Sequence, residues 1–391
     1  MKFEEVKQKG EKYLFQNYGR LDVAFEYGKG MYLYDDAGKQ YLDLVAGIAV
    51  NALGYAHPKW TEAMKQQLDK LCHVSNLYHI KEQAMAAEAV ASVTPKGLDR
   101  VLFVNSGAEA NEAALKLAVR ATGRKKILSA LNSFHGRTAG SLAATGQTKY
   151  QDTFQALMNL DSFKYYEYGD AESVKKLIDK DTAAFIVEPV QGEGGVKTVD
   201  PDFFKAARDL CTDNGTVMII DEVQTGIGRT GKWFGIQNFG VEPDVISLAK
   251  ALGNGMPIGA IAAKEELAKA LTPGTHGTTF GGNPLVTASA YTTINIIKEE
   301  KLVENSRDTG EYWRKQISGI KSDEIVDIRG YGLMTGIEMK TKANDFRKYC
   351  LDKGVLVNVC HGNTVRLIPP LIIGKEHCDV LTGLLREFLG C

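Results

Sequence analysis

The 391-residue sequence has no excess of charge of either sign and no long hydrophobic run. Its 47 lysines and arginines stand against 48 aspartates and glutamates, so the chain has no basic surplus to neutralise the phosphates of a nucleic acid. No apolar run approaches the roughly 20 residues of a membrane helix, and residues 1–20 do not resemble a secretory signal. We therefore expect neither a nucleic acid nor a membrane as partner.

Cysteine is scarce, and its six positions form no Cys-x-x-Cys pair and no repeated spacing (72, 211, 350, 360, 378 and 391). This pattern predicts neither a disulfide framework nor a zinc site. We expect reduced thiols in a cytoplasmic protein that binds no metal.

Apolar runs alternate with helical segments between about residues 100 and 260. Five of these runs are typical of strands buried on both faces: 100–105, 126–131, 183–187, 216–220 and 245–248. The β-α-β alternation predicts an α/β fold with a mostly parallel central sheet flanked by helices.

The two ends of the chain have sequence patterns that differ from that of residues 100–260. Residues 23–43 alternate apolar and polar side chains around glycine breaks, which predicts a small antiparallel meander. After Pro284 the sequence predicts helices at about 285–320, a glycine-broken strand pattern at 325–338, a helix near 343–353, strands near 355–368 and a final helix, which is an α+β pattern. We expect an N-terminal segment at 1–45 that joins a small domain, a large domain at 46–284, and the small domain itself at 285–391.

Lys250 stands at the carboxyl end of a predicted strand. It follows the apolar run 245–248, and glycines at 253, 255 and 259 exclude a long regular helix after it. Ligands of open α/β sheets bind at such strand ends, where a desolvated lysine loses its proton readily and becomes a nucleophile for carbonyls. The alternative is a surface lysine that caps a loop.

A strand-to-helix turn at Asn105-Ser-Gly-Ala offers an anion site. The free backbone amides of Gly107 and Ala108 and the hydroxyl of Ser106 lie at a predicted helix N-terminus, which suits a phosphate. Ser106 could equally be a plain N-cap. The turn carries none of the glycine motifs that bind dinucleotides or nucleoside triphosphates.

Asp221 ends the apolar run 216–220, so its carboxylate is expected to be nearly buried. A buried charge needs a partner. That partner could be a protonated ring nitrogen, an arginine or the start of the next helix.

Aromatic and charged side chains follow other strands at the same predicted sheet edge. Phe134 could stack on a planar heterocycle, and Arg137 could hold a carboxylate. A second arginine, Arg366, lies in an apolar run, and Glu193 is a candidate partner for it. One at a time these are ordinary loop residues, but together with the lysine, the aspartate and the phosphate site they predict an active site.

At these residues the sequence resembles the class-III aminotransferases, enzymes of fold type I that use pyridoxal 5′-phosphate. The likeness is carried by Asp221 with the following Glu-Val-Gln-Thr-Gly, by the strand-end Lys250 and by the Ser-Gly-Ala turn at 106, and it covers nearly the whole chain.

The resemblance implies a role for each of these residues. Lys250 would bind the cofactor covalently and shuttle a proton, and Asp221 would hold the ring nitrogen. The other implied cofactor contacts are Ser106, Gly107 and Ala108 on the phosphate, Phe134 and Val223 on the ring faces, Gln224 on the phenolic oxygen, and Thr279 on the phosphate of the neighbouring subunit. The last contact implies a homodimer with shared active sites.

Within the class, residues 47–54 and His135 are most similar to the acetylornithine aminotransferases of arginine biosynthesis. This likeness implies transfer of an amino group from N-acetylornithine to 2-oxoglutarate, which yields N-acetylglutamate 5-semialdehyde and glutamate. Arg366 would bind the α-carboxylate of glutamate and otherwise pair with Glu193, Arg137 would bind the second carboxylate, and His135 is a further candidate substrate contact. Ornithine, succinylornithine or 4-aminobutyrate as donor, an aminomutase, and a non-catalytic cofactor-binding protein remain alternatives.

Overall fold

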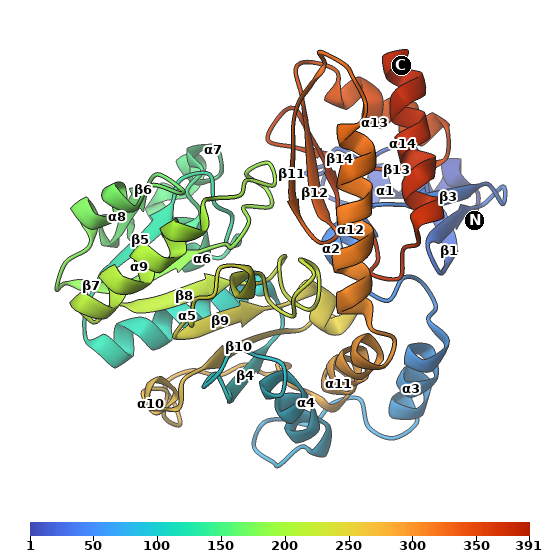
Figure 1. The fold of residues 1–391 in the computed structure, drawn as a ribbon. Helices are drawn as coiled ribbons and strands as arrows, with labels where there is room; N and C mark the ends of the chain where they lie inside the picture. Colours follow the sequence, from blue (N-terminus) through green and yellow to red (C-terminus); the bar gives the residue numbers. More distant parts are fainter.

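A seven-stranded sheet forms the centre of the larger part of the molecule in the computed structural model, which describes residues 1–391 (Figure 1). Its strands, in spatial order, are β4 (Arg100–Val104), β10 (Gly259–Ala263), β9 (Val245–Leu248), β8 (Val217–Asp221), β7 (Thr182–Val187), β5 (Lys126–Ala130) and β6 (Phe163–Tyr166). Neighbours from β9 to β6 are parallel, and β10 is antiparallel to both β4 and β9. The predicted, mostly parallel sheet is confirmed.

Helices cover both faces of this sheet, as the alternation of buried side chains requires. One face packs the alanine-rich helix α5 (Gly107–Thr122) against residues such as Ile186 and Ile219. The other face carries Phe185 and Ile220, which belong to the same apolar cluster as Phe204 of helix α9 (Pro201–Asn214). Shorter helical segments are α6 (Ala139–Ala144), α7 (Thr148–Gln151), η1 (Asp152–Leu157), η2 (Leu160–Ser162), α8 (Ala171–Leu177), η3 (Gly235–Asn238) and α10 (Glu265–Ala268).

The chain ends build two further sheets. Strands β1 (Phe25–Lys29), β2 (Tyr32–Asp35) and β3 (Gln40–Asp43) form the predicted antiparallel meander, and β3 pairs in parallel with β13 (Val355–Leu356). The second sheet has the order β11 (Ile325–Tyr331), β12 (Met334–Met339), β15 (Thr364–Leu367) and β14 (Asn358–Cys360). Helices α12 (Leu302–Ser318), α13 (Ala343–Asp352) and α14 (Lys375–Leu389) pack beside these sheets, and the polar helix α1 (Phe3–Tyr13) precedes them (Figure 1).

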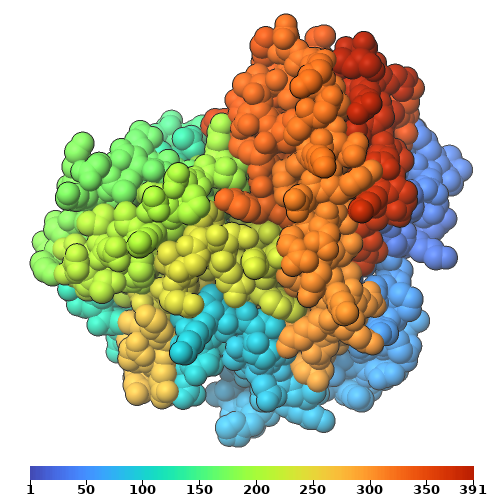
Figure 2. Space-filling model, viewed as in Figure 1, coloured from blue at the N-terminus to red at the C-terminus, as the bar shows by residue number.

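Helix α11 (Pro284–Glu299) lies where the two parts of the molecule meet. It packs against α3 (Pro58–Leu68) and α4 (Lys81–Ala91), and α12 continues from it into the C-terminal part (Figure 1). In the space-filling view, the C-terminal part of the chain, coloured orange, contacts the yellow segment from the middle of the chain (Figure 2). Nη1 of Arg229, in the loop after β8, strengthens this contact by donating to the carbonyls of Leu333 and Pro369. The domain boundaries at 45 and 284 stay a prediction.

None of the helices is long and apolar enough to pass through a lipid bilayer. All six cysteines are free, and no group of three or more His, Cys, Asp or Glu side chains is placed to hold a metal ion.

Candidate active site

A cavity of about 500 Å³ opens at the carboxyl ends of β4, β5, β7, β8 and β9. Most of the residues predicted for the site line it together: Ser106, Gly107, Ala108, Phe134, His135, Arg137, Glu193, Asp221, Val223, Gln224 and Lys250. These residues come from five separate segments of the chain, which meet because parallel strands end at the same sheet edge. Arg366 lies directly behind this wall, and Thr279 lies outside it.

Lys250 follows strand β9 and begins the short helix η4 (Lys250–Gly253), one residue after Ala249. Its φ of 46° lies in the left-handed region, which costs a non-glycine residue roughly 1–3 kcal/mol and is typical of functional sites. Burial lowers the pKa of Lys250, and the positive charge of Arg366 lowers it further. The lowered pKa makes the neutral, nucleophilic form of the lysine easier to reach.

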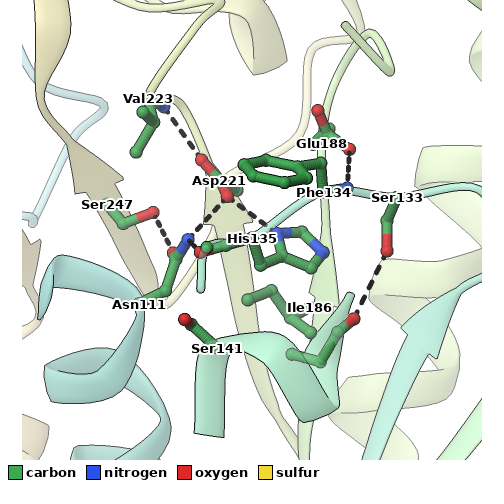
Figure 3. A network of polar contacts seen from close by, with 12 residues as sticks. Asn111, Ser133, Phe134, His135, Ser141, Ile186, Glu188, Asp221, Val223 and Ser247 are labelled. Atoms are coloured by element: carbon green, nitrogen blue, oxygen red, sulfur yellow. Dashed lines mark hydrogen bonds and ion pairs between the residues drawn. The ribbon is translucent and has the colours of Figure 1, made fainter. Parts of the chain in front are cut away.

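Asp221 is 3% exposed and is held by three donors (Figure 3). Its Oδ2 accepts from Nδ2 of Asn111 at 2.8 Å and from Nδ1 of His135 at 2.7 Å. Its Oδ1 accepts from the backbone amide of Val223 at 3.0 Å. All three contacts can be made by neutral donors, so this buried carboxylate is left to pair with a cationic group in the cavity.

His135 was predicted to bind substrate, and the structure gives its imidazole a different partner. The residue is 2% exposed and Nδ1 faces Asp221, so we assign the proton to Nδ1. The other ring nitrogen, Nε2, is buried without a hydrogen-bond partner, which favours the neutral ring because a proton there would have no acceptor. This geometry favours support of Asp221 over contact with a substrate.

The N-terminus of α5 lies against the same cavity. Ser106 is the N-cap, with its side chain accepting from the amide of Glu109 at 3.2 Å. The position of Gly107 has no room for a side chain, because a Cβ there would come within 2.8 Å of Cγ1 of Val223. The backbone can thus approach a ligand closely, and the free amides of the first helical turn suit an anion such as phosphate.

Arg366 is 1% exposed and is covered by Glu193. Its Nη1 pairs with Oε1 of Glu193 at 2.6 Å and donates to Oε1 of Gln224 at 3.2 Å, while Nε donates to Asn358 at 3.2 Å. Burial alone would raise the pKa of Glu193, but the guanidinium outweighs burial and the pKa is lowered. Glu193 lines the cavity and Arg366 does not, so an incoming carboxylate reaches the arginine only after Glu193 moves aside.

The second predicted carboxylate ligand, Arg137, is exposed and stands on aromatic rings. Its guanidinium lies 4.2 Å from the ring centroid of Tyr150 and 5.6 Å from that of Phe134. These cation–π contacts leave its N–H groups available at the mouth of the cavity. Tyr150 was not predicted, because a single tyrosine in a polar helix gives no sequence signal.

Thr279 is exposed in the segment between α10 and α11, beside Phe280, which is 62% exposed. Oγ1 of the preceding Thr278 accepts from Nδ2 of Asn105 at 2.8 Å, which holds this turn next to the N-terminus of α5. The predicted contact of Thr279 with the phosphate of a neighbouring subunit stays a prediction.

Glu188 and Asn111 are two site residues for which the sequence analysis predicts no role. Glu188 directly follows β7 and accepts from the amide of Phe134 (Figure 3) and from that of Gly192, so it ties together two loops of the cavity wall. Burial raises the pKa of Glu188 to about 7, with a further contribution from Asp221. Asn111 lies on the buried face of α5. A polar side chain among the buried alanines of that helix is the signal that could have revealed it.

The model of the family described as Aminotransferase class-III matches residues 13–389. The acetylornithine aminotransferase of Methanosarcina mazei is 47% identical over 385 residues, which cover 98% of this chain and 96% of that protein. The chain belongs to the class-III aminotransferases.

Solved structures agree with this membership. The ornithine aminotransferase of Toxoplasma gondii superposes with a TM-score of 0.93 at 31% identity, over 99% of this chain and 94% of that one. The acetylornithine aminotransferase of Elizabethkingia anophelis does so with a TM-score of 0.89 at 31% identity, over 99% of each chain. The aminotransferase therefore has the predicted fold type I architecture.

Class-III aminotransferases use pyridoxal 5′-phosphate, and the cavity of this aminotransferase fits that cofactor. The Ser106 turn provides an anion site, Gly107 provides the close backbone approach, and Asp221 provides a buried carboxylate with no cation of the chain bonded to it. Lys250 supplies the amine that the cofactor aldehyde requires.

Proposed function

We propose that this aminotransferase transfers the δ-amino group of N-acetylornithine to 2-oxoglutarate, forming N-acetylglutamate 5-semialdehyde and glutamate in arginine biosynthesis. The similarity to acetylornithine aminotransferases over nearly the whole chain supports this choice of donor. The Glu193–Arg366 pair is the structural observation that carries it.

The pair lets one pocket serve two substrates of different charge. When glutamate or 2-oxoglutarate binds, Glu193 moves aside and Arg366 holds the α-carboxylate, while Arg137 holds the second carboxylate. When the δ-amine of N-acetylornithine enters, no carboxylate is needed next to the reacting carbon. Glu193 then stays on Arg366 and keeps the buried guanidinium paired.

The residues around the cofactor have separate roles. Bound pyridoxal 5′-phosphate supplies the aldehyde that accepts the amino group and a ring that withdraws electrons from the reacting carbon. Asp221 keeps the ring nitrogen protonated, and Phe134 and Val223 hold the ring between them. Gln224 donates to the phenolic oxygen. Lys250, whose pKa burial lowers, would take a proton from the substrate's reacting carbon and return it on the cofactor side.

A second copy of the chain completes the site in this proposal. Thr279 lies outside the cavity of its own subunit, and exposed apolar side chains surround this region, among them Leu77, Tyr78 and Phe280. Large apolar side chains that are exposed in one region are typical of a surface that packs against a partner subunit. The free cysteines are in keeping with the cytoplasm as the setting.

A donor panel tests the proposed reaction. N-acetylornithine, ornithine, succinylornithine and 4-aminobutyrate are each combined with 2-oxoglutarate and the purified holoenzyme, and glutamate formation is measured. We expect the highest kcat/KM for N-acetylornithine. A higher value for another donor would assign that donor instead, and isomerisation of a donor without glutamate formation would indicate an aminomutase.

A further inference from the structure

We propose that Asn111 is a positioning residue that fixes the charge and orientation of Asp221 for the cofactor ring, with Ser247 setting the orientation of its amide. This inference depends on membership of the class-III aminotransferases and not on the identity of the amino donor. The three residues come from α5, β8 and β9, and Figure 3 shows their side chains pointing toward one another.

Every hydrogen-bonding group of the Asn111 amide has a partner. Nδ2 donates to Oδ2 of Asp221 at 2.8 Å and to the carbonyl oxygen of His135 at 2.7 Å. Oδ1 accepts from the hydroxyl of Ser247 at 2.6 Å. Because the His135 carbonyl can only accept, the NH₂ group must face it, and the amide has a single satisfactory orientation.

The pattern of donors around Asp221 leaves one place for a ligand. A carboxylate has about four lone-pair sites, two on each oxygen. Asn111 and His135 fill both sites of Oδ2, and the amide of Val223 fills one site of Oδ1. The remaining site, on Oδ1, is the one available to the ring N–H. Asn111 thus selects the oxygen that receives the cofactor.

Asn111 also connects the two ends of the cofactor site. It lies one helical turn after Gly107, whose amide belongs to the predicted phosphate site, and it bonds the backbone of the loop that carries Phe134. Asn111 is 1% exposed, and all the hydrogen-bonding groups of its amide are taken by residues of the chain. Its effect must pass through Asp221 and the His135 loop.

Asn111→Asp tests the proposal with almost no change in shape. The substitution places a carboxylate oxygen where the NH₂ group donates to Asp221, so two carboxylates share that site and one proton must be shared between them. We expect the holoenzyme to release pyridoxal 5′-phosphate on dilution at least about tenfold more readily, because the shared proton reduces the negative charge that Asp221 offers to the ring nitrogen. We also expect the pH dependence of the absorption spectrum of the bound cofactor to differ from that of the parent.

Asn305→Asp is the matched control. Nδ2 of Asn305 on α12 donates to the carbonyls of Leu371 and Ile373, and its Oδ1 accepts from Thr309. Asn305 thus donates two hydrogen bonds and accepts one, as Asn111 does, but it does not line the cavity. We expect this variant to melt at a lower temperature while its cofactor retention and spectrum stay unchanged.

Unchanged cofactor release and an unchanged spectrum in Asn111→Asp would overturn the proposal, as would equal cofactor loss in Asn305→Asp. If Asn111→Asp does not fold, Ser247→Ala tests the proposal instead. It removes only the donor to Oδ1 of Asn111, and it is expected to raise cofactor release by a smaller factor, roughly twofold to tenfold. Release within error of the parent in that variant would then reject the role.

Discussion

Glu193→Gln removes the negative charge that covers Arg366 while keeping the length of the side chain. The 2.6 Å contact joins a 1% exposed guanidinium to a carboxylate that is 28% exposed, so solvent screens it little. A charge-assisted hydrogen bond contributes about 1 to 1.5 kcal/mol more than a neutral one, which corresponds to a factor of roughly 5 to 13. We expect KM for glutamate to fall by that factor, because the arginine becomes easier to reach.

The assay follows each half-reaction separately through the absorbance of the cofactor, with glutamate and then with N-acetylornithine. The amine half-reaction should show no such gain, since it does not use the free arginine. Asp244→Asn serves as control because Asp244 also pairs with cations, Arg208 at 2.8 Å and Lys264 at 2.6 Å, at the opposite end of β9 from Lys250. Equal changes in both half-reactions, or weaker binding of glutamate, would refute the proposed exchange between Glu193 and substrate.

Three further predictions concern catalysis and stability. Lys250→Ala should lower the half-reaction rate at least roughly 100-fold, because the proton-transfer group is lost. The protein should still retain cofactor on gel filtration, because the contacts to its phosphate and ring nitrogen remain when the covalent link is gone; substantial remaining turnover would contradict the role of Lys250. Arg366→Ala should impair the glutamate half-reaction more than the amine half-reaction, and equal losses would count against carboxylate binding. Burial raises the pKa of both Glu188 and Glu222 from 4.5 to about 7, so the native state holds more protons than the unfolded state in that window. The free energy of unfolding should therefore fall as the pH rises through that window. In thermal melts at a series of pH values, Glu222→Gln should make this fall shallower. An unchanged slope would show that Glu222 does not contribute to the pH dependence of stability.

The strands that could be predicted are those whose composition differs most from a helix. The runs predicted at 183–187 and 216–220 are apolar except for Thr216 and are followed by charged residues, so they could be identified as strands. Strand β10 (Gly259–Ala263) was missed because Gly-Ala-Ile-Ala-Ala has neither alternation nor β-branched enrichment. Its antiparallel direction depends on neighbours that lie far away in the sequence.

In the active site, too, the residues with a clear local sequence pattern could be predicted, and the others could not. Lys250 and Asp221 could be predicted because each is a charged residue that directly follows an apolar run, a position with few structural explanations. Asn111 could not be predicted in this way, since its function depends on Asp221 and Ser247, which lie 110 and 136 residues away. His135 was expected to contact substrate, and only the fold shows that its imidazole faces Asp221.

The proposed chemistry requires a covalent bond between the amine of Lys250 and the aldehyde of pyridoxal 5′-phosphate beside Asp221. Reduction of the holoenzyme with borohydride, followed by proteolysis and mass spectrometry, locates this bond. We expect a single stable phosphopyridoxyl label, on the peptide that contains Lys250, and loss of the yellow colour. A label on a different lysine, or a fully loaded protein that takes up no label, would contradict it.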